Sequence, residues 1–320
     1  MKAMRVCVSV SLVFLLSLLG VGLAWSQNSS DSKSVSEASN FALSVQKKSN
    51  RESPKTKIED VPSPKKIINR FVKLVGGYEA IESIESIHVK ATSGPTSRNF
   101  EFESFYKGGL LAETYTYPQE GRVFTRGVRD GVGWEGYHRK ADRVYHGEEL
   151  KGYLFRASRR FWCSRWIDDC KSIKFVGIEK VNDKKTYVLR MEFKNGFKFD
   201  NYFGIESGLC VRSTSQEFVR GKTIENISTV LEFERVNGIL MTKKLEIVRD
   251  GTPEVYNYTE LEIDCKVSDS HFDFPDGLDK EKMVELSKGA EKREALVRTL
   301  LKKEKAIMKV TPFRARKPVK

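Results

Sequence analysis

The sequence predicts an α+β fold that is mainly β: one long, curved antiparallel sheet carrying a few short helices. Apolar and polar residues alternate over many short segments, which is the period of a strand. Turn sequences such as Asn195-Gly196 and Asp250-Gly251 separate neighbouring segments and favour tight connections. The predicted helices are too few and too badly placed to connect parallel strands, so we expect an antiparallel meander.

The composition is that of a globular protein with much of its charge at one end. Of 320 residues, 39% are hydrophobic and 31% are charged, unlike a disordered or collagenous chain. The 19 Phe and 11 Tyr favour strands. Residues 279–320 hold 14 basic and 6 acidic side chains, whereas residues 65–278 hold 34 and 32. The nearly neutral central region argues against a basic nucleic-acid groove.

The first 26 residues have the build of a secretory signal peptide. Lys2 and Arg5 precede an apolar run over residues 6–23, and small residues, Ala24 and Ser26, stand where a signal peptidase cleaves. The alternative is an uncleaved membrane anchor, because the run approaches the length that spans a bilayer. We expect cleavage after Ser26 and an exported protein.

Structure is expected to begin after a disordered spacer over residues 27–62, which is rich in Ser, Asn, Lys and Glu. Ser63-Pro64 predicts the start of a helix that ends at Gly76-Gly77. A second short helix over 78–83 leads into a strand over 87–92. One domain is predicted over residues 63–278.

Further strands follow, interrupted by one amphipathic helix over 148–160. They are predicted around 100–106 and over 110–117, 122–126, 173–180, 186–193, 197–203, 209–216, 224–235, 240–249 and 254–264.

The C-terminal 279–320 segment predicts a basic helix over 279–309 followed by a disordered end. Its apolar stripe would contact either the domain, which we favour, or an anionic membrane surface. Peripheral membrane contact through this helix is the alternative.

Four cysteines remain after cleavage: Cys163, Cys170, Cys210 and Cys265. An even number in an exported protein suggests disulfides, but four cysteines allow three connectivities. Cys163 and Cys170 form the easiest pair if the segment between them is not helical, because seven residues of helix span about 10 Å. The pairing stays open.

The search for catalytic motifs finds little. The chain has no GxSxG or P-loop sequence, and its GxGxxG-like run over 131–136 precedes a strand rather than a helix. His138, Asp142 and His146 would share a face of a helix, but their neighbours indicate two strands around a turn, so convergence on a metal is not expected. We predict no enzyme activity, no catalytic residues, no metal and no cofactor.

Apolar strand faces are the more informative feature. Each such residue alone would be ordinary core, but together they exceed what a few short helices can cover, which predicts an apolar cavity on the concave face. The candidates for its lining are Phe100, Phe102, Tyr106, Leu189, Met191, Phe193, Phe197, Phe199, Phe203, Leu231 and Phe233.

Short motifs, in order along residues 64–278, resemble the bacterial outer-membrane lipoprotein-sorting and lipoprotein-carrier-like superfamily. They lie at 74–81, 84–90, 130–135, 176–179, 206–209, 233–239 and 269–275. The resemblance implies an open half-barrel around an apolar cavity plugged by short helices, in the periplasm or cell envelope of a bacterium. Carriers of this superfamily escort lipoprotein acyl chains, and a related branch senses envelope stress. The basic C-terminal helix and the four cysteines depart from the carrier pattern.

We therefore expect an exported, non-enzymatic protein that binds a lipid or acyl chain in the sheet, in lipoprotein or lipid trafficking. The alternative is an envelope sensor or assembly partner that acts through protein contacts and has a filled interior. The sequence names neither the ligand nor the partner.

Overall fold

The computed structural model describes residues 61–93, 99–138, 140–158, 163–219, 222–278 and 283. The predicted signal peptide lies outside the described residues. The predicted spacer apart from residues 61 and 62, and the predicted C-terminal helix apart from Met283, lie outside them as well. Within the described part, no helix has the length and apolar character needed to cross a membrane.

The described chain builds a single antiparallel sheet of 13 strands, ordered β6-β5-β4-β3-β2-β1-β13-β12-β11-β10-β9-β8-β7. Two meanders, β1 to β6 and β7 to β13, are joined where β1 pairs with β13, so β6 and β7 lie at opposite edges of an unclosed sheet. This confirms the predicted fold class. The strands are β1 (Ser86–Ser93), β2 (Glu101–Lys107), β3 (Leu110–Tyr117), β4 (Arg122–Arg129), β5 (Val132–Tyr137), β6 (Lys140–Val144), β7 (Cys170–Val181), β8 (Lys184–Phe193), β9 (Lys198–Gly204), β10 (Cys210–Val219), β11 (Lys222–Val236), β12 (Ile239–Arg249) and β13 (Thr252–Ile263).

Turn chemistry sets the hairpins, as the sequence predicted. Asn237 and Gly238, between β11 and β12, have φ values of 48° and 83°. Asp250 and Gly251, between β12 and β13, have 47° and 80°. Two consecutive residues with positive φ make the turn whose twist matches that of antiparallel strands.

The described part of the chain has few helices, and they are short. They are α2 (Pro64–Val75), α3 (Tyr78–Glu82), α4 (Gly147–Ala157) and α5 (Trp166–Asp169), with 3-10 turns η2 (Pro118–Glu120), η4 (Cys163–Arg165) and η5 (Asp269–Phe272). The Ser63 side chain caps α2, and Gly76, at φ 145°, ends it. Phe71 of α2 stacks on Trp166 with ring centroids 5.7 Å apart and contacts Phe203 edge-on at 5.5 Å. This helix is therefore a buried cap on one half of the sheet.

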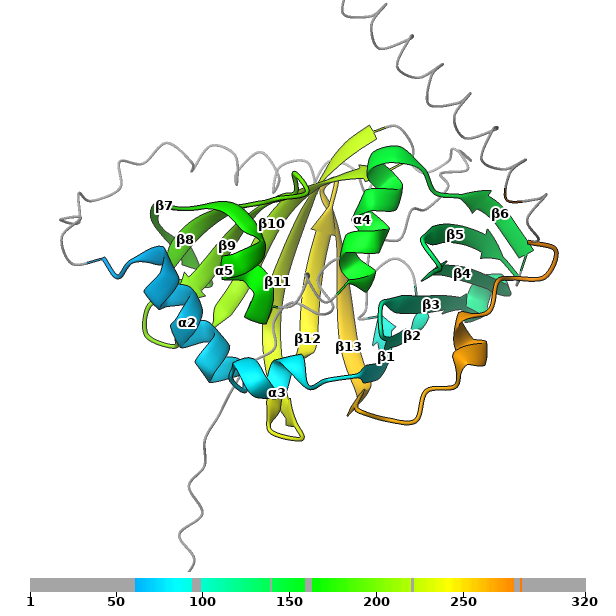
Figure 1. Ribbon diagram of the computed structural model, residues 1–320, viewed down its shortest axis with the longest axis horizontal. Coiled ribbons are helices and arrows are strands. Elements are labelled where there is room, and N and C mark those ends of the chain that lie inside the picture. Colours follow the sequence, from blue (N-terminus) through cyan, green and yellow to red (C-terminus); the bar gives the residue numbers. More distant parts are fainter. Residues whose placement is uncertain are drawn as a thin grey trace, which may run out of the picture.

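Helix α4 lies across the opening of the curved sheet (Figure 1). It contacts β10 of the second meander and β4 and β5 of the first. Leu150 and Leu154 pack against Tyr145 and Leu111, so α4 has the amphipathic character that the sequence predicted. Among the described helices, α4 has its main contacts with both halves of the sheet.

The segment between Cys163 and Cys170 is helical, since it consists of η4 and α5. The condition for the candidate disulfide is therefore not met, and all four described cysteines are free thiols. Cys163 is buried and Cys170 is partly buried. Burial is the main cause that raises the pKa of Cys170 to about 12, and the nearby Asp169 carboxylate is a smaller one.

Candidate functional site: the inner face of the sheet and helix α4

The structure brings most of the predicted lining residues together on the inner face. Eight belong to the main buried core, with side chains at most 6% exposed: Phe100, Phe102, Tyr106, Leu189, Met191, Phe193, Phe199 and Phe203. Phe197 and Phe233 are partly buried and pack against the same core.

Leu231 is the exception, and its assignment to the lining is wrong. Its side chain is 41% exposed, while the preceding residue, Val230, is buried in the core. The pairing of β11 with β12 shifts register between Val230 and Glu232 and again between Glu232 and Phe233. A bulge of this kind breaks the period-two pattern from which the side of Leu231 was inferred.

Helix α4 packs on three phenylalanines of the hairpin formed by β8, β9 and the connection between them. The ring of Phe155 lies 5.1 Å from Phe193, 5.3 Å from Phe197 and 6.4 Å from Phe199, measured between centroids. Phe193 and Phe199 contact each other edge-on at 5.6 Å. A single helix residue thus covers a surface made of three phenylalanines.

A second aromatic group lines the other half of the sheet. Phe102 of β2 and Phe100, which immediately precedes β2, contact Tyr115 of β3 and Tyr256 of β13 at centroid distances of 4.8 to 6.0 Å. All four side chains are at most 2% exposed. The inner face is therefore aromatic on both sides of α4.

An ion pair is buried beneath α4. Arg126 of β4 pairs with Glu113 of β3, and both side chains are at most 1% exposed. The same guanidinium donates hydrogen bonds to the hydroxyls of Tyr115, at 2.9 Å, and Tyr153 of α4, at 3.0 Å. Burial alone would lower the pKa of Arg126, but the charge of Glu113 and the tyrosines keep it well above its usual range. Arg126 therefore stays charged and connects α4 to the sheet.

A second charged group holds the first turns of α4. Arg143 of β6 donates to both carboxylate oxygens of Glu149, at 2.6 and 2.7 Å, and to Glu135 of β5, at 3.0 Å. The hydroxyl of Tyr145 donates to the other oxygen of Glu135 at 2.9 Å. Both glutamates are at most 9% exposed. Bidentate pairing of this kind fixes orientation as well as adding energy.

Sequence reasoning missed this buried network. Its signal was a charged residue at an inward position between apolar ones, as with Glu113 between Leu111 and Tyr115, and Arg126 between Phe124 and Val128. Inward-pointing charges in neighbouring strands suggest a pair, because unpaired charges are rarely buried.

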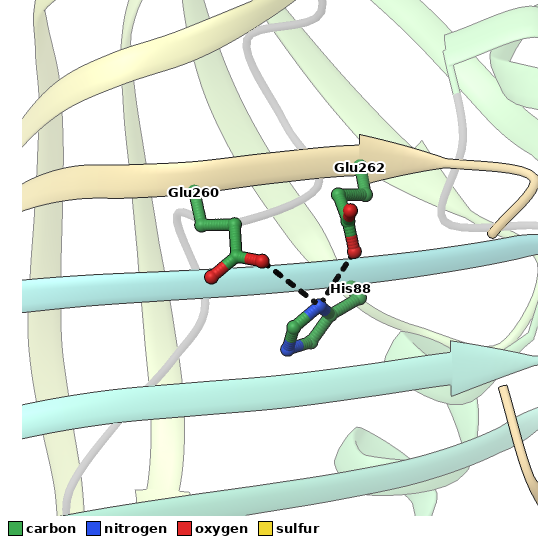
Figure 2. Close-up of side chains that lie close together, drawn as sticks. All are labelled: His88, Glu260 and Glu262. Atoms are coloured by element: carbon green, nitrogen blue, oxygen red, sulfur yellow. Dashed lines mark hydrogen bonds and ion pairs between the residues drawn. The ribbon is translucent and has the colours of Figure 1, made fainter. Parts of the chain in front are cut away.

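The residues first considered as metal ligands do not form a ligand group in the described structure. Asp142 accepts a hydrogen bond from the backbone of Tyr137 at 3.1 Å, and His146 precedes α4. A different group does have ligand spacing: one ligand atom each from His88, Glu260 and Glu262 lie within 4.8 Å of one another. It lies on the outer face, because these positions alternate with inward-facing ones, and Figure 2 shows it between β1 and β13.

Comparisons with known proteins give structural neighbours. A scan against protein-family models and a search of curated proteins found no match. The chain is similar to the structure of a DUF1329 family protein from Desulfovibrio piger (TM-score 0.44, 14% identity, 67% of this chain and 98% of that one). It is also similar to a LolA superfamily protein from Nitrosomonas europaea (0.44, 12%, 67% and 98%). A third neighbour is an outer membrane lipoprotein-sorting protein domain from Vibrio parahaemolyticus (0.42, 13%, 66% and 97%).

Proposed function

We propose that the chain is an exported, non-enzymatic protein that binds a lipid or acyl chain between helix α4 and the inner face of the sheet. The observation that supports this most directly is the contact of Phe155 with Phe193, Phe197 and Phe199. If α4 moves away, these rings become an apolar surface on the concave side of the sheet. An acyl chain would replace Phe155 on that surface.

The energies of the exchange favour a long apolar ligand. Removing a buried phenylalanine from its contacts costs about 3–5 kcal/mol. Each methylene of an acyl chain that leaves water gains about 0.8 kcal/mol, so ten buried methylenes contribute roughly 8 kcal/mol. A long-chain lipid can therefore displace Phe155, whereas a ligand with only a few methylenes cannot.

The experiment is to purify the full chain from the envelope of the cells that export it and to analyse its organic extract by mass spectrometry. We expect acyl species in the extract and binding of a fluorescent fatty acid by the delipidated protein. Phe197→Asp should weaken that binding at least tenfold, because it places a charge on the apolar surface.

The matched control is Leu231→Asp, which introduces the same charge at an exposed side chain and should leave fatty-acid binding unchanged. Finding neither acyl species nor fatty-acid binding in a folded protein would refute the proposal. Equal weakening by both variants would place the fatty acid somewhere other than the inner face.

A second candidate function has its own support. The predicted lining residues Phe100, Phe102, Met191 and Phe199 are almost completely buried against one another and their neighbours. A filled interior suits an envelope sensor or assembly partner that works through protein contacts. Under this proposal the folded protein carries no lipid, and its surface binds an envelope protein.

A further inference from the structure

We propose that His88, Glu260 and Glu262 form a binding site for a divalent metal ion of the zinc class on the outer face of the sheet. His88 lies in β1, and the two glutamates occupy successive outward positions of β13, where Glu262 is directly opposite His88. Figure 2 shows both carboxylates converging on the imidazole.

Both ring nitrogens of His88 face carboxylates. Its Nε2 is 2.9 Å from an oxygen of Glu103, and its Nδ1 is 2.9 Å from an oxygen of Glu262. A neutral imidazole has one N–H, and ionised carboxylates only accept hydrogen bonds. With one N–H directed to Glu103, the lone pair of Nδ1 points towards the carboxylates of Glu262 and Glu260, where a cation could be bound between nitrogen and oxygen.

The acidic residues around His88 also favour binding of a cation. Glu103, Glu260 and Glu262 bring three carboxylates, and Lys90 brings one ammonium. The Lys90 ammonium lies 2.7 Å from one oxygen of Glu260, which leaves the other oxygen facing Nδ1 at 3.9 Å. Carboxylates therefore outnumber the lysine at this site, which suits a divalent cation.

The spacing suits a tetrahedral ion. Zinc binds imidazole nitrogen and carboxylate oxygen at about 2.0–2.2 Å, so two of its ligand atoms lie roughly 3.4 Å apart. The distances from Nδ1 to Glu262 and Glu260, 2.9 and 3.9 Å, fall on either side of that value. Three protein ligands leave a fourth position for water. The carboxylates are 39% and 48% exposed at the side chain, so an ion can reach them from solvent.

The surroundings of His88 hold its ring in the required orientation. The ring stacks on Phe105 with centroids 4.4 Å apart and planes 5° from parallel. Glu103 accepts a hydrogen bond from Nε2–H, which selects the tautomer with a free lone pair on Nδ1. A carboxylate behind a ligating histidine is the usual arrangement in zinc sites. The ion would connect β1 to β13, the pairing that joins the two meanders.

The test is a titration of the metal-free, tag-free full chain with Zn²⁺ in competition with a chromophoric chelator. We expect one tight site, weakened at least tenfold by Glu262→Gln and at least a hundredfold by His88→Gln. Glu103→Gln should weaken it by about 10–100-fold, the usual effect of losing such a partner. Zn²⁺ should also raise the melting temperature of the wild type but not that of Glu262→Gln.

His271→Gln is the matched control, because His271 stacks on the other side of Phe105, at 3.8 Å, outside the ligand group. This variant and Cys265→Ser should bind Zn²⁺ as the wild type does. Glu262 is exposed, so its variant is expected to fold even if His88→Gln does not. No tight site in the wild type, or unchanged affinity in Glu262→Gln, would overturn the proposal and leave a proton as the positive species beside His88.

Discussion

Replacing Arg126 by methionine should destabilise the protein in a way that depends on pH. The substitution keeps an unbranched apolar side chain but removes the guanidinium that binds Glu113, Tyr115 and Tyr153. Glu113 is 1% exposed, and its Oε1 has no hydrogen-bond partner among the described residues. A buried carboxyl that has lost its cation binds a proton rather than remaining charged.

The magnitude follows from the work of keeping that carboxyl neutral. An ordinary glutamic acid titrates near 4.3, so neutrality costs about 1.4 kcal/mol per pH unit above that value, or roughly 1 kcal/mol at pH 5 and roughly 3.7 kcal/mol at pH 7. The folded variant holds the Glu113 carboxyl in its protonated form. The variant therefore has no such penalty below about pH 4.3, and its free energy of unfolding falls as the pH rises above that value. Relative to wild type, Arg126→Met should lose about 2.7 kcal/mol more at pH 7 than at pH 5.

Urea unfolding followed by far-UV circular dichroism at both pH values measures this difference. The control is Arg190→Met, since Arg190 forms a bidentate pair with Asp200 at 2.7 and 2.8 Å but is 56% exposed. Its loss should be at most about 1 kcal/mol. The double variant Arg126→Met with Glu113→Leu should recover most of the loss, because both buried charges are gone. A pH-independent loss, or a double variant no more stable than Arg126→Met, would refute the reasoning.

Four further predictions concern local packing and titration. Gly152→Ala in α4 should raise the free energy of unfolding in urea by about 0.5–1 kcal/mol, because the added Cβ would lie 3.7 Å from a phenylalanine ring, in ordinary contact. Gly76→Ala should lower the free energy of unfolding by about 1–3 kcal/mol. The reason is that Gly76 has a φ of 145° and its added Cβ would lie 2.5 Å from an isoleucine on β12. Burial raises the pKa of Tyr115 and Tyr145 well above 10, so stability that is full below pH 10 should fall above it, as unfolding at pH 9 and 11 would show. With its pKa near 12, Cys170 should react far more slowly with a thiol reagent at pH 8 in the native protein than in urea; equal rates would contradict its burial.

The parts of the fold that depend on local signals could be predicted from the sequence. The strand expected over 186–193 is β8 at Lys184–Phe193, and the one expected over 240–249 is β12 at Ile239–Arg249. Alternation and turn dipeptides fix such segments within one hairpin. Features set by bulges or distant pairings could not be predicted: Leu231 changes side at a bulge, and His88 meets Glu262 only because β1 pairs with β13.

The two attachments of α4 differ in kind, and this determines how the helix would respond to a ligand. Its first turns are held by charge, through Glu149 and Arg143, and Tyr153 accepts a hydrogen bond from Arg126, while the ring of Phe155 near its end packs on Phe193, Phe197 and Phe199. An acyl chain can replace an aromatic contact but offers nothing to a buried guanidinium. If the proposed function is right, the last turn of α4, which carries Phe155, leaves the sheet first, and the contacts of Arg143 with Glu149 and of Arg126 with Tyr153 keep the rest of the helix in place. The charged network would then act as the fixed side of the opening, which explains why an apolar interior retains such buried charges.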